Sequence, residues 1–267
     1  PSGVAPTVTN SSGTAINFGT PTAITFSAGV ATVNSGNNGV LRLVKVETAT
    51  VAITDTASGI GTAGGGELTV TVNTGPAAKL VIGGSPTQTA GIAQTLTITA
   101  QDSLGNTATG YTGSRFLTFS GANASANGTQ PTVTNGSGTA VNFGSVTSIN
   151  FSNGVATASG GSNGALVLVK AEVATVAVTD SGGINSAAGG NLAVTVSATS
   201  AAALVIAGSS IQAAGATQNL TITARDIFSN TATPYTGVKM LTFSGASAAP
   251  NGTLPTVAVH DFAVHPT

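Results

Sequence analysis

Residues 77–129 read AAKLVIGGSPTQTAGIAQTLTITAQDSLGNTATGYTGSRFLTFSGANASANGT, and residues 201–253 return as AAALVIAGSSIQAAGATQNLTITARDIFSNTATPYTGVKMLTFSGASAAPNGT. The second copy begins 124 residues after the first, at position 201 instead of position 77. An interval of this length is too long for one rung of a solenoid and matches the size of a globular domain. The chain is therefore interpreted as domains in series.

The rest of the chain follows the same period. The phrase PTVTN at residues 6–10 is repeated at residues 131–135, a shift of 125 residues, and the two shifts differ because one residue is lost near Ile60 and Ile184. PTV returns once more at residues 255–257, and the sequence then diverges from the earlier copies.

Short runs of alternating apolar and polar residues recur in every copy. In LTIT, Leu96 and Ile98 fall on one face and Thr97 and Thr99 on the other, which is the period of a half-buried β-strand. Turn-forming sequences such as SLGN at residues 103–106 separate these runs. About seven short strands in ~125 residues predict an all-β protein of tandem Greek-key β-sandwiches.

The words AKLVI, TAG and LTITAQDSLGNTATGYTG, within residues 78–113, resemble the bacterial immunoglobulin-like repeats of invasin- and intimin-like adhesins and other giant surface proteins. In that family a strand ends in an Asp-x-x-Gly-Asn turn, which DSLGN matches at residues 102–106, whereas DIFSN at residues 226–230 lacks the glycine. The resemblance covers the whole chain as tandem copies. It implies immunoglobulin-like (Ig-like) sandwiches, an extracellular or cell-surface location, and a domain that opens with the LVI strand and closes with the LTVTV strand.

With those boundaries, only residues 76–199 form a complete Ig-like repeat. Residues 1–75 are the C-terminal part of one repeat, and residues 200–267 are the N-terminal part of another, with a divergent tail from residue 258. Two explanations remain open: a window on a longer covalent array, or a subunit whose partial domains are completed by neighbours through strand complementation. Head-to-tail contacts of the second kind build an open filament unless they close into a ring.

The composition argues against several classes of function. Charged residues make up only 6% of the chain and the net charge is −1, so there is no electrostatic footprint for nucleic acid. No apolar run approaches the roughly 20 residues of a membrane-spanning helix. The chain has no cysteine, which excludes a disulfide framework and cysteine-based metal sites.

Catalytic machinery is not expected either. Residues 76–199 contain no histidine and no cysteine, and their only carboxylates are Asp102, Glu172 and Asp180. These carboxylates are too scattered in the sequence to suggest an acid–base pair. We predict no enzymatic activity, no catalytic residues and no cofactor.

A few side chains could in principle hold a metal ion. These candidates are Asp102, Asn106, Asp226, Asn230, His260, Asp261 and His265. The Asp and Asn residues suit Ca²⁺, but this ion needs six to eight oxygens, and an Asp in a turn equally well accepts hydrogen bonds from backbone amides. The two histidines and the aspartate of the tail suit Zn²⁺. We expect no metal at either place.

Two copies of one sequon are candidates for glycosylation. Asn-Gly-Thr occurs at residues 127–129 and again at residues 251–253, in the same turn-like loop of successive repeats. Asn127 and Asn251 are therefore the best acceptors for a glycan, and a glycan would help to keep so uncharged a surface soluble.

These observations predict a structural subunit or segment of an extracellular filament or surface fibre. Its partner is the chain itself, in a head-to-tail homopolymer or a covalent tandem array. Two alternatives stay open: a passive spacer segment of a large cell-surface adhesin, and an accessory module of a secreted enzyme.

Overall fold

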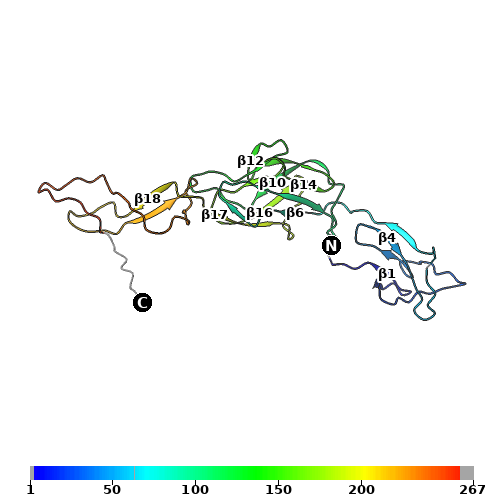
Figure 1. Cartoon of the computed structure of the whole chain (residues 1–267). Coiled ribbons are helices and arrows are strands. Elements are labelled where there is room, and N and C mark those ends of the chain that lie inside the picture. The colour runs from blue at the N-terminus through cyan, green and yellow to red at the C-terminus, as the bar shows by residue number, and fades with distance from the viewer. Residues whose placement is uncertain (1–2, 63, 259–267) are drawn as a thin grey trace, which may run out of the picture. The chain divides into compact units, whose positions relative to one another are not determined.

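The computed structural model describes residues 3–62 and 64–258 (Figure 1). Strands, turns and irregular segments make up these residues, which contain no helix. No helix that could cross a membrane is therefore present in this part of the chain. The chain divides into two compact units, Pro1–Pro234 and Tyr235–Thr267. The predicted all-β class is confirmed.

Residues 76–199, here called the middle repeat, carry most of the strands. Its front part, residues 76–130, holds β6 (Lys79–Gly83), β7 (Thr87–Thr89), β8 (Gln94–Thr95), β9 (Thr97–Gln101) and β10 (Gly113–Ser120). Its back part, residues 131–199, holds β11 (Thr132–Thr134), β12 (Ala140–Asn142), β13 (Val146–Phe151), β14 (Val155–Thr157), β15 (Ala165–Val167), β16 (Val173–Asp180) and β17 (Leu192–Ser197).

These strands form three hydrogen-bonded sheets. One has five strands in the order β13-β10-β16-β17-β7, one has four in the order β12-β11-β15-β8, and one has three in the order β14-β9-β6. The β17–β7 pair is parallel, and the other ladders of the middle repeat are antiparallel. Strand β8 of the four-stranded sheet and β9 of the three-stranded sheet are separated by one residue, so the chain passes directly from one of these sheets into the other. This arrangement is consistent with a β-sandwich.

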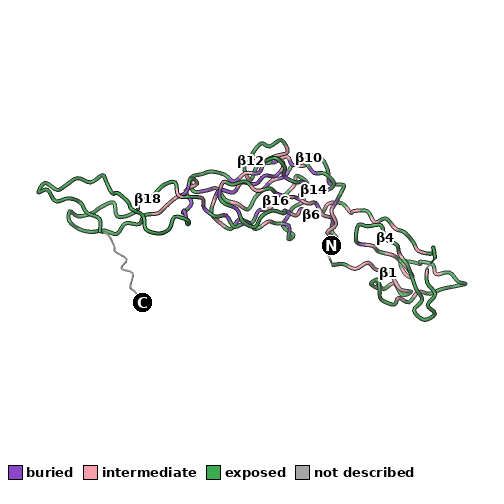
Figure 2. Tube along the Cα trace, viewed as in Figure 1, coloured by how far each residue is buried: buried purple, intermediate pink, exposed green. Residues whose placement is uncertain are grey.

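The apolar core of the chain lies in the middle repeat, where Figure 2 shows most of the buried backbone. Leu96 and Ile98 are both buried, whereas Thr97 and Thr99 between and after them are only half-buried. Along β16 every second residue from Ala174 to Val178 is buried in the same way. The period-two pattern read from the sequence is therefore the pattern of burial.

The two terminal parts contain fewer and shorter strands. The back part of the first copy, residues 3–62 and 64–75, holds β1 (Thr7–Thr9), β2 (Ala15–Asn17), β3 (Leu41–Arg42), β4 (Thr48–Val51) and β5 (Leu68–Thr71). The front part of the third copy, residues 200–258, holds only β18 (Ala203–Ala207) and β19 (Thr221–Arg225). Strand β1 pairs with β2 and with β3, β4 pairs with β5, and β18 pairs with β19.

Candidate functional site

The turn DIFSN follows β19 and is held together by the carboxylate of Asp226. One oxygen accepts hydrogen bonds from the backbone amides of Phe228 (2.9 Å) and Asn230 (2.8 Å). The other accepts hydrogen bonds from the Asn230 side chain (2.9 Å) and from the backbone amide of Thr199 (3.1 Å). Because Thr199 belongs to the segment that joins two repeats, the carboxylate ties this turn to the linker before it.

Asn230 extends this contact into the preceding repeat. Its Nδ2 donates to the carbonyl of Val169 at 2.9 Å, and its Oδ1 accepts from the amide of Ala171 at 2.8 Å. The side-chain amide thus pairs with a backbone segment as a neighbouring strand would. Asp226 and Asn230 are both buried, and together they form what we call the second junction clamp.

The same contacts recur one repeat earlier, in the first junction clamp of Asp102 and Asn106. Asp102 accepts hydrogen bonds from the linker amide of Gly75 (3.2 Å), from the amides of Leu104 and Asn106 (2.9 Å each), and from the side chain of Asn106 (3.0 Å). Asn106 donates to the carbonyl of Val44 (3.0 Å) and accepts from the amide of Val46 (3.2 Å). Each hydrogen bond of the second clamp thus has a counterpart in the first clamp, between the corresponding atoms.

Asp102 and Asp226, the two candidate Ca²⁺ ligands, use their carboxylate oxygens to accept hydrogen bonds. Both oxygens of Asp102 and both oxygens of Asp226 accept hydrogen bonds from amides. Within residues 3–62 and 64–258, no group of three or more His, Cys, Asp or Glu side chains lies close enough to hold a metal ion. His260, Asp261 and His265 lie outside the described residues.

The hydrogen bonds also decide the charge state of the clamps. Burial by itself would raise the pKa of Asp226, but the hydrogen bonds from Asn230 and from the amides of Thr199 and Phe228 outweigh burial and hold that pKa below its usual 3.8. The pKa of Asp102 is lowered in the same way against its own burial, by Asn106, Gly75 and Leu104. Since each hydrogen bond is donated to an oxygen, ionisation of the carboxylate strengthens all of them.

An apolar contact accompanies the second clamp. Phe228 packs against the core of the middle repeat, and a Cβ atom at Gly91 would lie only 2.5 Å from Cζ of its ring. Gly91 also has a φ of +78°, which side chains rarely tolerate. Glycine at this position therefore lets the ring approach the backbone.

The sequon residue Asn127 lies at the same junction. Its Nδ2, the atom that a glycan would occupy, donates to the carbonyl of Ile227 at 2.9 Å. Both Asn127 and its counterpart Asn251 are exposed, and the Oδ1 of each accepts from the amide of its sequon threonine at 3.1 Å. The bond to Ile227 has no counterpart at Asn251 among the described residues. The two sequons thus have different surroundings, although their sequences are the same.

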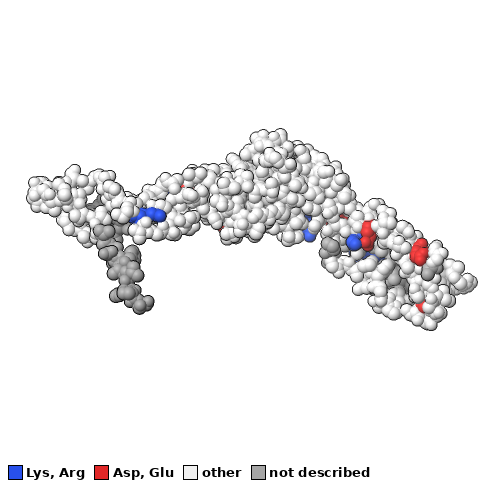
Figure 3. Space-filling view, in the orientation of Figure 1, with Lys and Arg blue, Asp and Glu red and all other residues white. Residues whose placement is uncertain are grey.

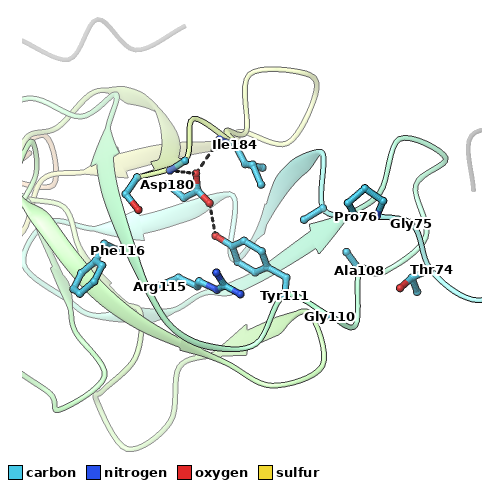
Figure 4. Close-up of a pocket in the computed structure, with 13 residues that line it drawn as sticks. Thr74, Gly75, Pro76, Ala108, Gly110, Tyr111, Arg115, Phe116, Asp180 and Ile184 are labelled. Carbon is cyan, nitrogen blue, oxygen red and sulfur yellow. Dashed lines mark hydrogen bonds between the residues drawn. The ribbon is translucent and has the colours of Figure 1, made fainter.

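A second polar arrangement joins the two parts of the middle repeat (Figure 4). Tyr111, from the loop before β10, donates its phenol hydrogen to Oδ2 of Asp180 at 2.8 Å. Oδ1 of Asp180, the last residue of β16, accepts from the amides of Gly182 and Ile184, each at 2.8 Å. The guanidinium of Arg115 lies 4.4 Å from the centre of the Tyr111 ring, a favourable placement for a cation.

The surroundings of Tyr111 keep its phenol protonated. Burial has the largest effect on the pKa of Tyr111, followed by the hydrogen bond to Asp180 and the negative charge of the Asp180 carboxylate. Together they raise this pKa well above its usual 10. An open pocket of about 610 Å³ lies beside the pair and is lined by Thr74, Pro76 and Ile184 among others. Tyr111 therefore keeps its proton and donates it in the hydrogen bond to Asp180, and this bond connects the front part of the repeat to its back part.

Sequence reasoning identified both clamp turns but missed the Tyr111–Asp180 pair. The two residues are 69 positions apart, so no local spacing relates them. On the face drawn in Figure 3 charged side chains are few, which agrees with the low charge of the sequence. Neither a family model nor a curated protein matches the chain.

Proposed function

We propose that the chain is a structural subunit or segment of an extracellular filament or surface fibre built from Ig-like repeats. In this proposal the partial terminal repeats are completed by the matching parts of other copies, through strand complementation. The chain is then its own partner, and the middle repeat is the template for each joint.

The Ig-like assignment is supported by the sheet order of the middle repeat. A five-stranded sheet ends in β7, which runs parallel to the last strand β17. Strands β6 and β8, which come directly before and after β7 in the sequence, belong to the two smaller sheets. There β6 pairs with β9, and β15 pairs with β8 and β11. A first strand that contributes to both layers, with a last strand beside it, suits an Ig-like sandwich.

The observation that carries the proposal is the division of strand pairs between the two parts of a repeat. In the middle repeat four pairs lie within one part: β6–β9, β11–β12, β11–β15 and β16–β17. The terminal parts form the counterpart of each one: β18–β19, β1–β2, β1–β3 and β4–β5. The terminal parts therefore form every strand pair whose two strands both lie within the front part or both lie within the back part of a repeat.

The remaining pairs of the middle repeat join its front part to its back part. They are β10–β13, β10–β16, β14–β9, β15–β8 and β17–β7. Strands β7, β8, β10, β13 and β14 have partners only across this division, and none of them has a strand counterpart in the described residues of the terminal parts. A missing partner explains each missing strand.

The apolar residues of the terminal parts support the same conclusion. Leu117 and Phe119 of β10 are 0% and 1% exposed, whereas their counterparts Leu241 and Phe243 are each 40% exposed. In the first copy Phe26 and Ile53 are exposed, although Phe151 and Val178 at the same positions of the middle repeat are buried. The terminal sequences thus keep core residues that only a complementary part can cover.

The experiment is sedimentation velocity and negative-stain microscopy of the purified 267-residue chain over a wide range of concentrations. We expect linear assemblies whose length grows with concentration, because both ends of each copy offer a complementary part. A chain that stays monomeric at every concentration would contradict strand complementation. The mass of fully denatured native material then separates the two forms: 25.5 kDa for a homopolymer of this chain, a larger mass for a covalent array.

A further inference from the structure

We propose that each joint between two copies is held in register by a polar lock, in which Tyr235 of one copy donates its phenol hydrogen to Asp55 of the next. This inference rests on the proposed function and adds the residues that align the two parts. The partner is a second copy of the chain.

The template is the bond between Tyr111 and Asp180 in the middle repeat. It connects the front part to the back part, and Asp180 lies directly opposite Leu117 in the β10–β16 ladder. The repeat interval relates Tyr111 to Tyr235, Leu117 to Leu241 and Asp180 to Asp55. The same bond in a joint therefore requires Tyr235 from the third copy and Asp55 from the first copy of a neighbour.

The half of the lock on the third copy is already assembled. Lys239 takes the place of Arg115, and its Nζ lies 4.8 Å from the centre of the Tyr235 ring, as the guanidinium of Arg115 lies over Tyr111. Tyr235 is 39% exposed, whereas Tyr111 is 6% exposed. The tyrosine and its cation are thus arranged for an acceptor that the described residues of this part do not supply.

The half on the first copy is arranged in the same way. Oδ1 of Asp55 accepts from the amide of Ala57 at 3.0 Å, as Oδ1 of Asp180 accepts from Gly182. Oδ2 of Asp55 accepts from the hydroxyl of Ser58. The corresponding atom in the middle repeat, Oδ2 of Asp180, is the one that accepts from Tyr111. Hydrogen bonds from Ser58 and from the amide of Ala57 lower the pKa of Asp55, so the carboxylate is ionised and ready to accept another donor.

A lock of this kind has a physical role that apolar contacts do not fill. A slip of two residues along a ladder returns the apolar side chains to the same face, so hydrophobic burial alone discriminates poorly between such registers. A slip of two would separate the phenol from the carboxylate and leave the phenol, which is buried in the template, without its acceptor, which is unfavourable. The lock therefore selects the register that places Leu241, Thr242 and Phe243 opposite Asp55, Thr54 and Ile53.

Disulfide mapping tests the register, because the chain has no cysteine of its own. The full-length variant Thr242→Cys/Thr54→Cys is expected to oxidise into a ladder of disulfide-linked oligomers. The matched control Thr242→Cys/Thr50→Cys places the second thiol on the same strand face about 13 Å away, beyond the reach of a disulfide, and is expected to give no ladder. Thr118→Cys/Thr179→Cys, opposite each other in the middle repeat, should close within one chain.

The polar lock is tested by Tyr235→Phe and Asp55→Asn in the Thr242→Cys/Thr54→Cys background. Each is expected to lower the yield of ladder at a limiting concentration about tenfold, the loss typical of a hydrogen bond to a charged group. Tyr111→Phe, the same change inside one chain, is the control that should leave the yield unchanged.

The outcomes separate the lock from the proposed function. A ladder whose yield is the same in Tyr235→Phe and Asp55→Asn overturns the lock and leaves strand complementation standing. Assemblies that are linked through Thr50→Cys and not through Thr54→Cys overturn the register. No assembly of the unmodified chain and no ladder from any variant overturn the proposed function together with the lock.

Discussion

Replacing Phe119 with alanine is expected to lower the free energy of unfolding of the middle repeat by about 3–5 kcal/mol, the usual effect of removing a phenylalanine from a core. Phe119 is buried in β10, and its ring lies 6.0 Å from that of Phe143. Phe119 belongs to the buried core of the middle repeat, whose strands are held in place by hydrogen-bonded ladders, so the cavity left behind cannot easily collapse. Thermal unfolding of the dilute chain measures this change.

The matched variant is Phe243→Ala, which changes the same residue one repeat later. Phe243 is substantially exposed, so in the dilute chain its replacement is expected to change the unfolding of the middle repeat by less than about 0.5 kcal/mol. At assembly concentrations the same replacement removes a core residue of the joint, and polymers should be lost. Equal destabilisation by the two variants in dilute solution would mean that Phe243 is buried without a partner, which contradicts the proposal.

This pair of residues also shows what the sequence could not decide. Residues 113–120 and 237–244 both end in Leu-Thr-Phe-Ser and carry a basic residue two positions before the leucine, yet only the first segment is a strand. Strand propensity is similar in both, but β10 has β13 and β16 as neighbours. Pairing between distant segments decides the difference, as expected when a strand is stabilised mainly by its context.

The junction clamps were predictable only in part. The DSLGN and DIFSN turns stand out in the sequence because Asp and Asn are turn residues, and their oxygens make them candidate metal ligands. Their partners across the junction are the backbone groups of Val44, Val46, Val169 and Ala171. A backbone carbonyl or amide leaves no trace in residue identity, so the contact between repeats had to come from the structure.

Replacing Asp226 with alanine is expected to open the second junction. The backbone amides of Thr199, Phe228 and Asn230 would lose their acceptor at once. A buried donor without a partner typically costs about 1–3 kcal/mol. Because the bond from Asn230 is buried whereas those from Thr199 and Phe228 are half-buried, the clamp should be weakened by about 1–3 kcal/mol. Hydrogen exchange of these three amides is the measurement, and Asn251→Ala, a change in an exposed turn that contributes no residue to either clamp, is the control. Unchanged protection in Asp226→Ala would show that the clamp does not hold the junction.

Acid should have the same effect as this replacement, and the direction follows from the pKa of Asp226. The hydrogen bonds of the clamp hold that pKa below 3.8 in the folded chain, so the unfolded or opened chain takes up the proton first as the pH falls. The stabilisation is therefore complete above about pH 4 and is lost as the pH falls through the lowered pKa. Protection of the Thr199, Phe228 and Asn230 amides, corrected for the intrinsic exchange rate, should decrease below pH 4 in the unmodified chain. Asp226→Ala should lack this step, because no carboxylate remains there to be protonated, and a step of equal size in both chains would assign it to another group.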